Sequence, residues 1–121
     1  MRLLTVVNGA LVVGSMASAV IGLVKPSLLL PGGEVSVGLE LYAARALPLG
    51  AAVLYALSGR AKPELLLPML TVAGIVQAVD VVIGLRQGVP GMVVGGSVSA
   101  VVHLASAWIL HTRQRPAPAA A

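Results

Sequence analysis

The sequence has no cysteine, no phenylalanine and few charged side chains. Without cysteine the chain forms no disulfide, no thiolate metal site and no cysteine nucleophile, and its redox compartment stays undetermined. Charged residues make up 10% of the 121 residues and hydrophobic residues 58%, whereas a soluble domain carries about 25% charged residues. A soluble fold of this length cannot bury so much apolar surface. We therefore predict one domain that is surrounded mostly by lipid.

The formal net charge of +4 does not indicate a nucleic-acid-binding protein. Such proteins gather basic side chains in patches, often with aromatic residues among them. Here the basic residues stand singly or in pairs between apolar runs. We exclude nucleic acid as a partner and expect the lipid bilayer instead.

Four apolar segments are long enough to cross the bilayer, which takes about 20 residues of helix. Proline and glycine separate them, and their approximate bounds are 3–24, 35–58, 64–85 and 90–110. This pattern predicts an all-α fold, a four-helix antiparallel transmembrane bundle. We assign residues 1–112 to a single four-span membrane domain and residues 113–121 to a disordered cytoplasmic tail.

The first span also resembles a secretory signal, because Arg2 and an apolar stretch precede the cleavage-like pattern Ala17-Ser18-Ala19. The apolar run continues through Val24, and cleavage would remove one helix of a four-helix set. We expect the segment to be retained.

Basic residues near the span ends predict the orientation, because short cytoplasmic loops carry more Lys and Arg. Lys25 and Arg86 lie on one side of the membrane. The other side has Arg2, Arg60, Lys62, Arg113 and Arg115. This distribution predicts a multi-pass protein of the plasma membrane with both termini in the cytoplasm. The loop that contains three leucines, 28–30, then faces outward, either in the interface or over the mouth of the bundle.

Three ionisable side chains lie inside the predicted spans, where each needs a partner or a function. They are Arg45, Asp80 and His103. At 1.5 Å per residue, Arg45 and Asp80 lie roughly 8–15 Å below the outer surface and His103 at roughly 20 Å. Tyr42 lies one turn from Arg45, and Gln77 one turn from Asp80. We predict that these five side chains form one internal cluster and assign them to ligand binding.

Two interpretations of this cluster stay open. In the first, Arg45 and Asp80 are a structural ion pair that fixes helix register, and His103 is hydrogen-bonded to a nearby carbonyl. In the second, Asp80 holds or gives a proton and Arg45 holds an anion or a carbonyl oxygen. An ion pair in the membrane gives little net stability over apolar packing, which favours a functional site.

Small residues recur at four-residue spacing in two spans. They are Ala10, Gly14, Ser18 and Gly22 in the first span and Gly95, Ser99, His103 and Ala107 in the fourth. Small residues let helix backbones approach closely in lipid, so we interpret both stripes as packing surfaces. Spacings typical of metal ligands or of a Ser-His-Asp set are absent from the sequence, and we expect no metal and no cofactor.

The chain resembles a family of small four-span bacterial membrane proteins in the DoxX-like neighbourhood, over about Tyr42 to Trp108. The resemblance rests on Arg45 followed by Gly50, on Asp80 followed by Leu85-Arg86-Gln87-Gly88, and on His103. It implies the four-span fold and topology but no activity. Similar proteins often have an acidic residue directly after the arginine, where this chain has Ala46. That departure makes Asp80 the expected partner of Arg45.

Three functions are compatible with these observations. The first is binding of a hydrophobic small molecule at the outward-facing polar site. The second is a membrane-embedded isomerase or cyclase, in which Asp80 is the general acid and His103 or Tyr42 steers a lipophilic substrate. An arginine paired tightly with Asp80 opposes this role because it holds the carboxyl group ionised. The third is an accessory subunit, in a homo-oligomer or a larger membrane complex.

The predicted orientation is testable with topology reporters. Fusions after Gly59 and at the C-terminus are both expected to report a cytoplasmic location, because five of the seven basic residues near the span ends lie on that side. A periplasmic signal from either fusion contradicts the topology.

Overall fold

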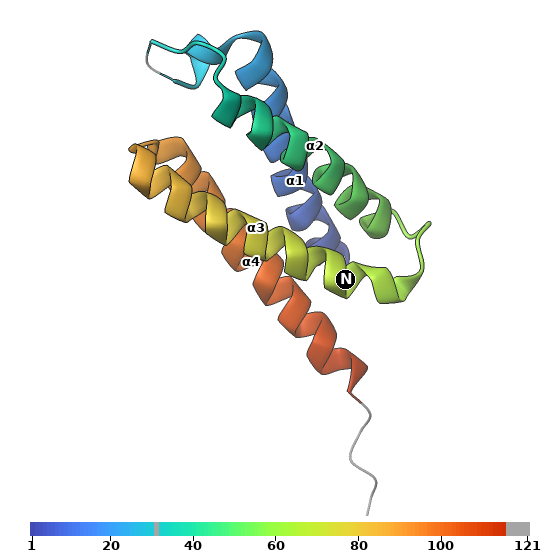
Figure 1. The fold of residues 1–121 in the computed structure, drawn as a ribbon. Coiled ribbons are helices and arrows are strands. Elements are labelled where there is room, and N and C mark those ends of the chain that lie inside the picture. The colour runs from blue at the N-terminus through green and yellow to red at the C-terminus, as the bar shows by residue number, and fades with distance from the viewer. Residues whose placement is uncertain (31, 116–121) are drawn as a thin grey trace, which may run out of the picture.

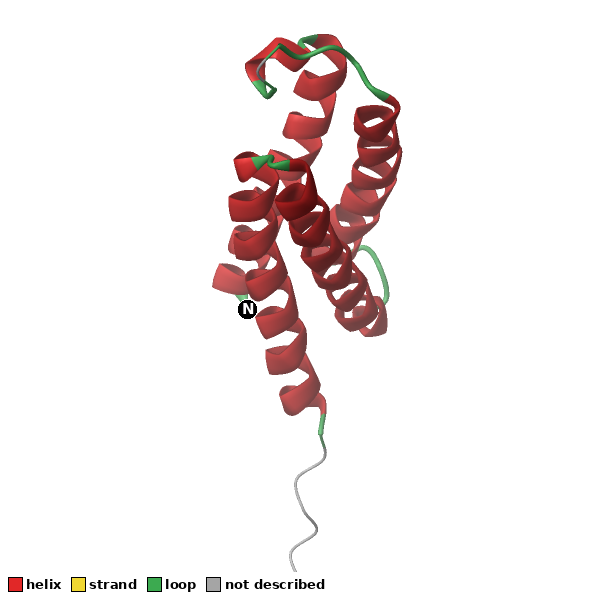
Figure 2. Ribbon diagram, turned by 60° about the vertical axis from the view of Figure 1, so that its left-hand side comes forward, coloured by secondary structure: helices red, strands yellow, loops and turns green. Residues whose placement is uncertain are grey.

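The computed structural model describes residues 1–30 and 32–115, and every regular element within them is helical (Figure 2). The four long helices are α1 (Arg2–Val24), α2 (Val37–Leu57), α3 (Leu66–Gln87) and α4 (Pro90–Gln114). Two short 3-10 helices, η1 (Pro26–Leu28) and η2 (Pro63–Leu65), precede α2 and α3. The predicted all-α four-helix bundle is confirmed.

Glycine, proline and one side-chain cap set the helix ends. Ser36 is extended and accepts a hydrogen bond from the backbone N–H of Leu39 at 3.3 Å, which caps the start of α2. Gly88 has a φ of 65°, a left-handed conformation that favours glycine, and it ends α3. Pro90 is the first residue of α4, where its missing N–H costs nothing.

Several boundaries differ from the predicted ones by a few residues, among them the start of α2 and the end of α3. Pro63 opens a 3-10 turn, so α3 begins at Leu66 and not at residue 64. Helix α4 continues to Gln114, past the predicted span end at residue 110 and into the segment assigned to the tail. Most of that tail, residues 116–121, lies outside the described residues.

The chain is arranged as two helical hairpins, α1 with α2 and α3 with α4, whose successive helices run in opposite directions (Figure 1). The hairpins pack together mainly at the end that holds the N-terminus and the α2–α3 turn. The buried apolar cluster there consists of Val12, Val53, Leu70, Ala73, Ala107 and Leu110. At the opposite end the hairpins are separated by a cleft.

Glycine permits close helix packing within each hairpin. A Cβ atom on Gly50 of α2 would lie 2.5 Å from Met16 of α1. One on Gly74 of α3 would lie 2.5 Å from the Cγ of Leu104 and 3.3 Å from its backbone N. Each helix pair is therefore held at a distance that larger residues do not allow.

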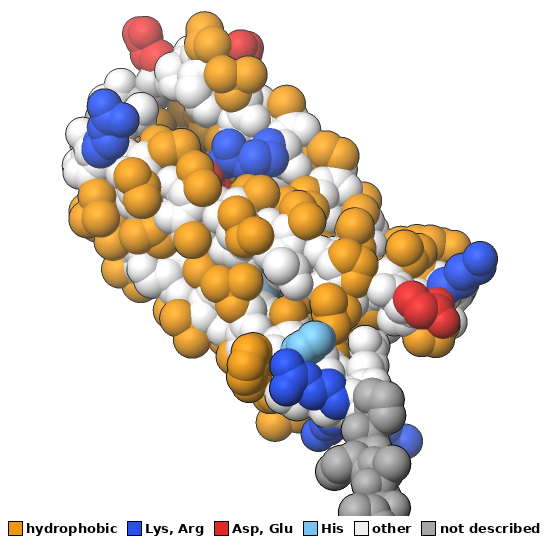
Figure 3. Space-filling view, turned by 60° about the horizontal axis from the view of Figure 1, so that its bottom comes forward, with side chains coloured by type: hydrophobic (Ala, Val, Ile, Leu, Met, Phe, Trp, Pro, Cys, Tyr) orange, Lys and Arg blue, Asp and Glu red, His pale blue; other side chains and the backbone are white. Residues whose placement is uncertain are grey.

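The outer surface is apolar over most of its length. All four long helices are long and apolar enough to cross a membrane, and only 17% to 39% of the residues in each apolar stretch are buried. Exposed residues include Val24 at 80%, Val37 at 71% and Val101 at 67%. Hydrophobic side chains are spread over the whole face seen in Figure 3, and basic side chains lie in a few separate places on it, several of them at its lower end. Soluble monomers rarely expose such continuous apolar surface, so this is a multi-pass helical membrane protein.

Two glycine substitutions test the packing within the hairpins. Gly74→Ala is expected to destabilise the protein by about 1–3 kcal/mol, because the added methyl group overlaps Leu104 of α4. The matched control is Gly95→Ala, since a Cβ atom there meets nothing within 4 Å. Thermal unfolding in detergent measures both, and equal stability of the two variants contradicts the packing described.

Candidate functional site

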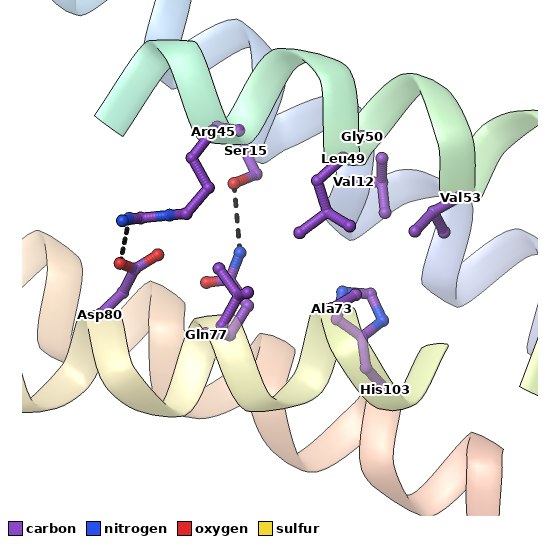
Figure 4. Close-up of a pocket in the computed structure, with 12 residues that line it drawn as sticks. Val12, Ser15, Arg45, Leu49, Gly50, Val53, Ala73, Gln77, Asp80 and His103 are labelled. Carbon is purple, nitrogen blue, oxygen red and sulfur yellow. Dashed lines mark hydrogen bonds and ion pairs between the residues drawn. The ribbon is translucent and has the colours of Figure 1, made fainter. Parts of the chain in front are cut away.

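An ion pair joins the two hairpins inside the bundle. Nη2 of Arg45 on α2 donates to Oδ1 of Asp80 on α3 (Figure 4). The Asp80 side chain is 4% exposed, whereas that of Arg45 is 36% exposed. The helix register therefore brings together the two charges that were predicted to lie at matched depth. Both residues line the cleft, but Asp80 is almost completely buried and Arg45 is partly exposed.

Three neutral polar residues surround this pair. The guanidinium Cζ of Arg45 lies 5.7 Å from the ring centroid of Tyr42, which is a cation–π distance. The Tyr42 hydroxyl lies 3.2 Å from Oγ of Ser15, and Nε2 of Gln77 donates to the same Oγ at 3.4 Å. Ser15 of α1 thus connects α2 with α3. It is absent from the predicted site, although its depth in the first span matches that of Arg45 and Asp80.

His103 belongs to a second polar group, deeper in the bundle. Its Nδ1 lies 2.6 Å from Oδ1 of Asn8 on α1. Nδ2 of Asn8 donates to Oγ of Ser106 at 2.8 Å and to the backbone oxygen of Leu4 at 2.8 Å. Both Asn8 and His103 are buried, at 0% and 2% exposure. The partner of His103 is therefore the carbonyl oxygen of a side-chain amide, which agrees with the nearby carbonyl of the first interpretation. Asn8 is a second residue absent from the predicted site.

A small internal cavity of about 20 Å³ separates the two polar groups. Its polar lining consists of Ser15, Arg45, Gln77, Asp80 and His103. Apolar residues of α1, α2 and α3 line the rest, and the His103 ring of α4 points into the space between the hairpins (Figure 4). Four of the five predicted residues thus share one cavity, but His103 does not contact the ion pair through a hydrogen bond.

A much larger cleft, of about 760 Å³, opens between the hairpins on the other side of the ion pair. Tyr42, Arg45, Gln77 and Asp80 line it, and His103 does not. The apolar walls include Leu11, Leu39, Leu41, Ile83, Met92 and Val98. From the loop after α1, Leu29 and Leu30 also line the cleft, as expected if this loop covers the mouth of the bundle.

The small-residue stripes face this cleft for part of their length. Its lining includes Ala10, Gly14, Ser18, Gly95 and Ser99. A Cβ atom on Gly14 or Gly95 would meet no atom within 4 Å. The interpretation of the stripes as packing surfaces is therefore wrong for these two glycines. The packing interpretation holds for His103 and Ala107, which are buried nearer the C-terminal end of α4.

Hydrogen-bonding groups around the ion pair are not all satisfied by the protein. The Nε–H of Arg45 is buried and has no hydrogen-bond partner among the described residues. Within the same part of the chain, no group of three His, Asp or Glu side chains is placed to hold a metal ion. The site can therefore donate hydrogen bonds to a ligand or to water, next to one nearly buried carboxylate.

Comparisons of the chain with protein-family models, with curated proteins and with solved structures find no match. The fold and the site therefore carry the functional argument alone.

Substitutions of the ion pair are expected to have unequal effects. Arg45→Leu leaves the enclosed Asp80 carboxylate without a partner, and loss of one partner from a buried pair costs about 3–5 kcal/mol. Asp80→Leu is expected to cost less, because Arg45 is partly exposed in the cleft. The double variant is expected to recover most of the stability, since two leucines pack without a charge. Thermal unfolding in detergent measures all three. Single variants as stable as the unaltered protein contradict a structurally coupled pair.

Proposed function

We propose that this protein binds a hydrophobic small molecule in the cleft between its two hairpins, at the outer side of the plasma membrane. The observation that supports this most is the shape and lining of the cleft. Ligand pockets have volumes of about 300–1,000 Å³ and mostly apolar walls with a few polar groups. The cleft, at about 760 Å³, combines leucine, valine and methionine walls with the Arg45–Asp80 pair.

The proposed orientation follows from the basic residues. Most of them lie at the end with the N-terminus and the α2–α3 turn, which the positive-inside rule assigns to the cytoplasm. The cleft is at the other end, because residues after α1 and around the α3–α4 turn line it. A ligand therefore enters from the outer leaflet or the outer aqueous phase.

The charge balance of the site favours a neutral ligand. Asp80 already neutralises Arg45, so an anion has to displace the carboxylate from the guanidinium. A carbonyl or hydroxyl oxygen needs only one of the remaining guanidinium N–H groups or the Tyr42 hydroxyl. We propose a lipophilic molecule with an oxygen function near one end, whose apolar part lies between Leu39 and Ile83.

The enzymatic alternative has less support. A general acid must carry a proton, and the bond from Arg45 stabilises the ionised form of Asp80. His103, the other proposed catalytic residue, does not line the cleft. An isomerase or cyclase would thus require Arg45 to leave Asp80 first. We keep the resemblance to DoxX-like proteins as a proposal about the fold, and it implies no activity. The binding experiment described below also tests an accessory-subunit role.

Filling the cleft tests the proposed binding. Gly14→Leu and Gly95→Leu place side chains into open cleft space, so they are expected to remove a bound molecule while the melting temperature changes little. Gly9→Leu is the matched control, because its Cβ also meets no atom within 4 Å and it lies outside the cleft. Native mass spectrometry of the protein released from lipid nanodiscs measures retention.

The unaltered protein and Gly9→Leu are expected to carry a hydrophobic molecule that both cleft variants lose. The folded double variant Arg45→Leu with Asp80→Leu is expected to retain less of it, because only the Tyr42 hydroxyl and the Gln77 amide are then left to hold its oxygen. Retention by all variants, or an unaltered protein that carries only a protein partner, refutes the proposal. The latter result supports an accessory subunit.

A further inference from the structure

Asn8 fixes the hydrogen-bonding state of His103. Both N–H bonds of its Nδ2 are used, by the Ser106 hydroxyl and the Leu4 backbone oxygen, each at 2.8 Å. Turning the amide around would place its oxygen against the Leu4 oxygen, and two acceptors form no hydrogen bond. Oδ1 of Asn8 must therefore face Nδ1 of His103, at 2.6 Å.

An amide oxygen only accepts hydrogen bonds, so Nδ1 of His103 has to donate. In a neutral imidazole one nitrogen carries the proton and the other carries a lone pair. The only carboxylate on the cavity that His103 lines, Asp80, is already bonded to Arg45, so no free counter-charge stabilises an imidazolium ion. The neutral ring then has its proton on Nδ1 and a free lone pair on Nε2.

The internal cavity has the size and polarity that a water molecule needs. A cavity of about 10–15 Å³ or more, with two to four polar partners, holds one water, and this cavity measures about 20 Å³. The buried, unpartnered Nε–H of Arg45 belongs to a lining residue, as do the Gln77 amide and the Asp80 carboxylate. Among the described residues, Nε2 of His103 has no hydrogen-bond partner either.

We propose that the internal cavity is a buried water site, in which Nε2 of His103 accepts a hydrogen bond from water. Asn8 is the positioning residue, because its amide selects the Nδ1–H tautomer. The water site places a proton acceptor beneath the Arg45–Asp80 pair, whose two residues line both this cavity and the cleft. This inference goes beyond ligand binding and stands whether or not the cleft is occupied.

Nuclear magnetic resonance of labelled histidine tests the proposal. The chain has two histidines, so His111→Gln leaves His103 as the single reporter, in the full-length protein in lipid bilayers at neutral pH. Correlations between the ring nitrogens and carbons are expected to show one tautomer, with the proton on Nδ1. Polarisation transferred from water protons is expected to reach Nε2. A proton on Nε2, an even tautomer mixture or no transfer from water overturns the proposal.

Three variants in the same His111→Gln background test the tautomer and the water site separately. Asn8→Leu removes the acceptor, so part of the His103 population is expected to move to the Nε2–H tautomer. Asn8→Gln keeps a neutral amide with an acceptor oxygen and is expected to preserve Nδ1–H, which provides a second measurement if Asn8→Leu does not fold. Ala73→Val adds two carbons to the cavity wall and is expected to abolish the water transfer while the tautomer is kept. Unchanged transfer in this variant overturns the water site.

Discussion

The contact between Arg45 and Asp80 determines how the two hairpins meet. In the part of the chain that the structure describes, it is the one ion pair, and it links α2 to α3 where the apolar core ends and the cleft begins. A carboxylate that is 4% exposed inside a lipid-embedded bundle requires this partner. The pair therefore fixes the register of α2 against α3, and it also forms the polar end of the cleft. The structural and functional interpretations of the pair are thus compatible.

The distribution of glycine separates packed surfaces from open ones. Gly50 and Gly74 lie where a neighbouring helix leaves no space for a methyl group, so they hold the helices of each hairpin together. Gly14 and Gly95 have the same residue type and similar spacing but face open space. At these positions glycine enlarges the cleft and does not tighten a helix contact. A small residue in a membrane helix is therefore informative only when the opposing surface is known.

The sequence predicts the four helices well because apolar length, proline and glycine act locally. Depth counting also pairs Arg45 with Asp80 correctly, since antiparallel neighbours place residues of equal depth side by side. Depth counting over ionisable residues and their neighbours does not include Ser15, which lies at matching depth, or Asn8. It also grouped His103 with the ion pair, although Asn8 is its hydrogen-bond partner. Side-chain partners and the division between core and cleft depend on how far the hairpins separate, and no local pattern encodes that.

The two polar groups differ in how completely the protein satisfies them, and this difference indicates their roles. Asn8 uses both amide donors and its acceptor on groups of the protein itself, as a structural network in a membrane interior requires. Around Arg45, by contrast, the protein leaves a buried N–H unpaired beside a polar cavity and a wide cleft. A buried donor without a partner costs free energy. Such a cost is offset when water or a ligand completes the hydrogen bonds. The Asn8–His103 group thus meets the requirements of a structural network by itself, and the unpaired donor of Arg45 is the feature on which the proposed binding depends.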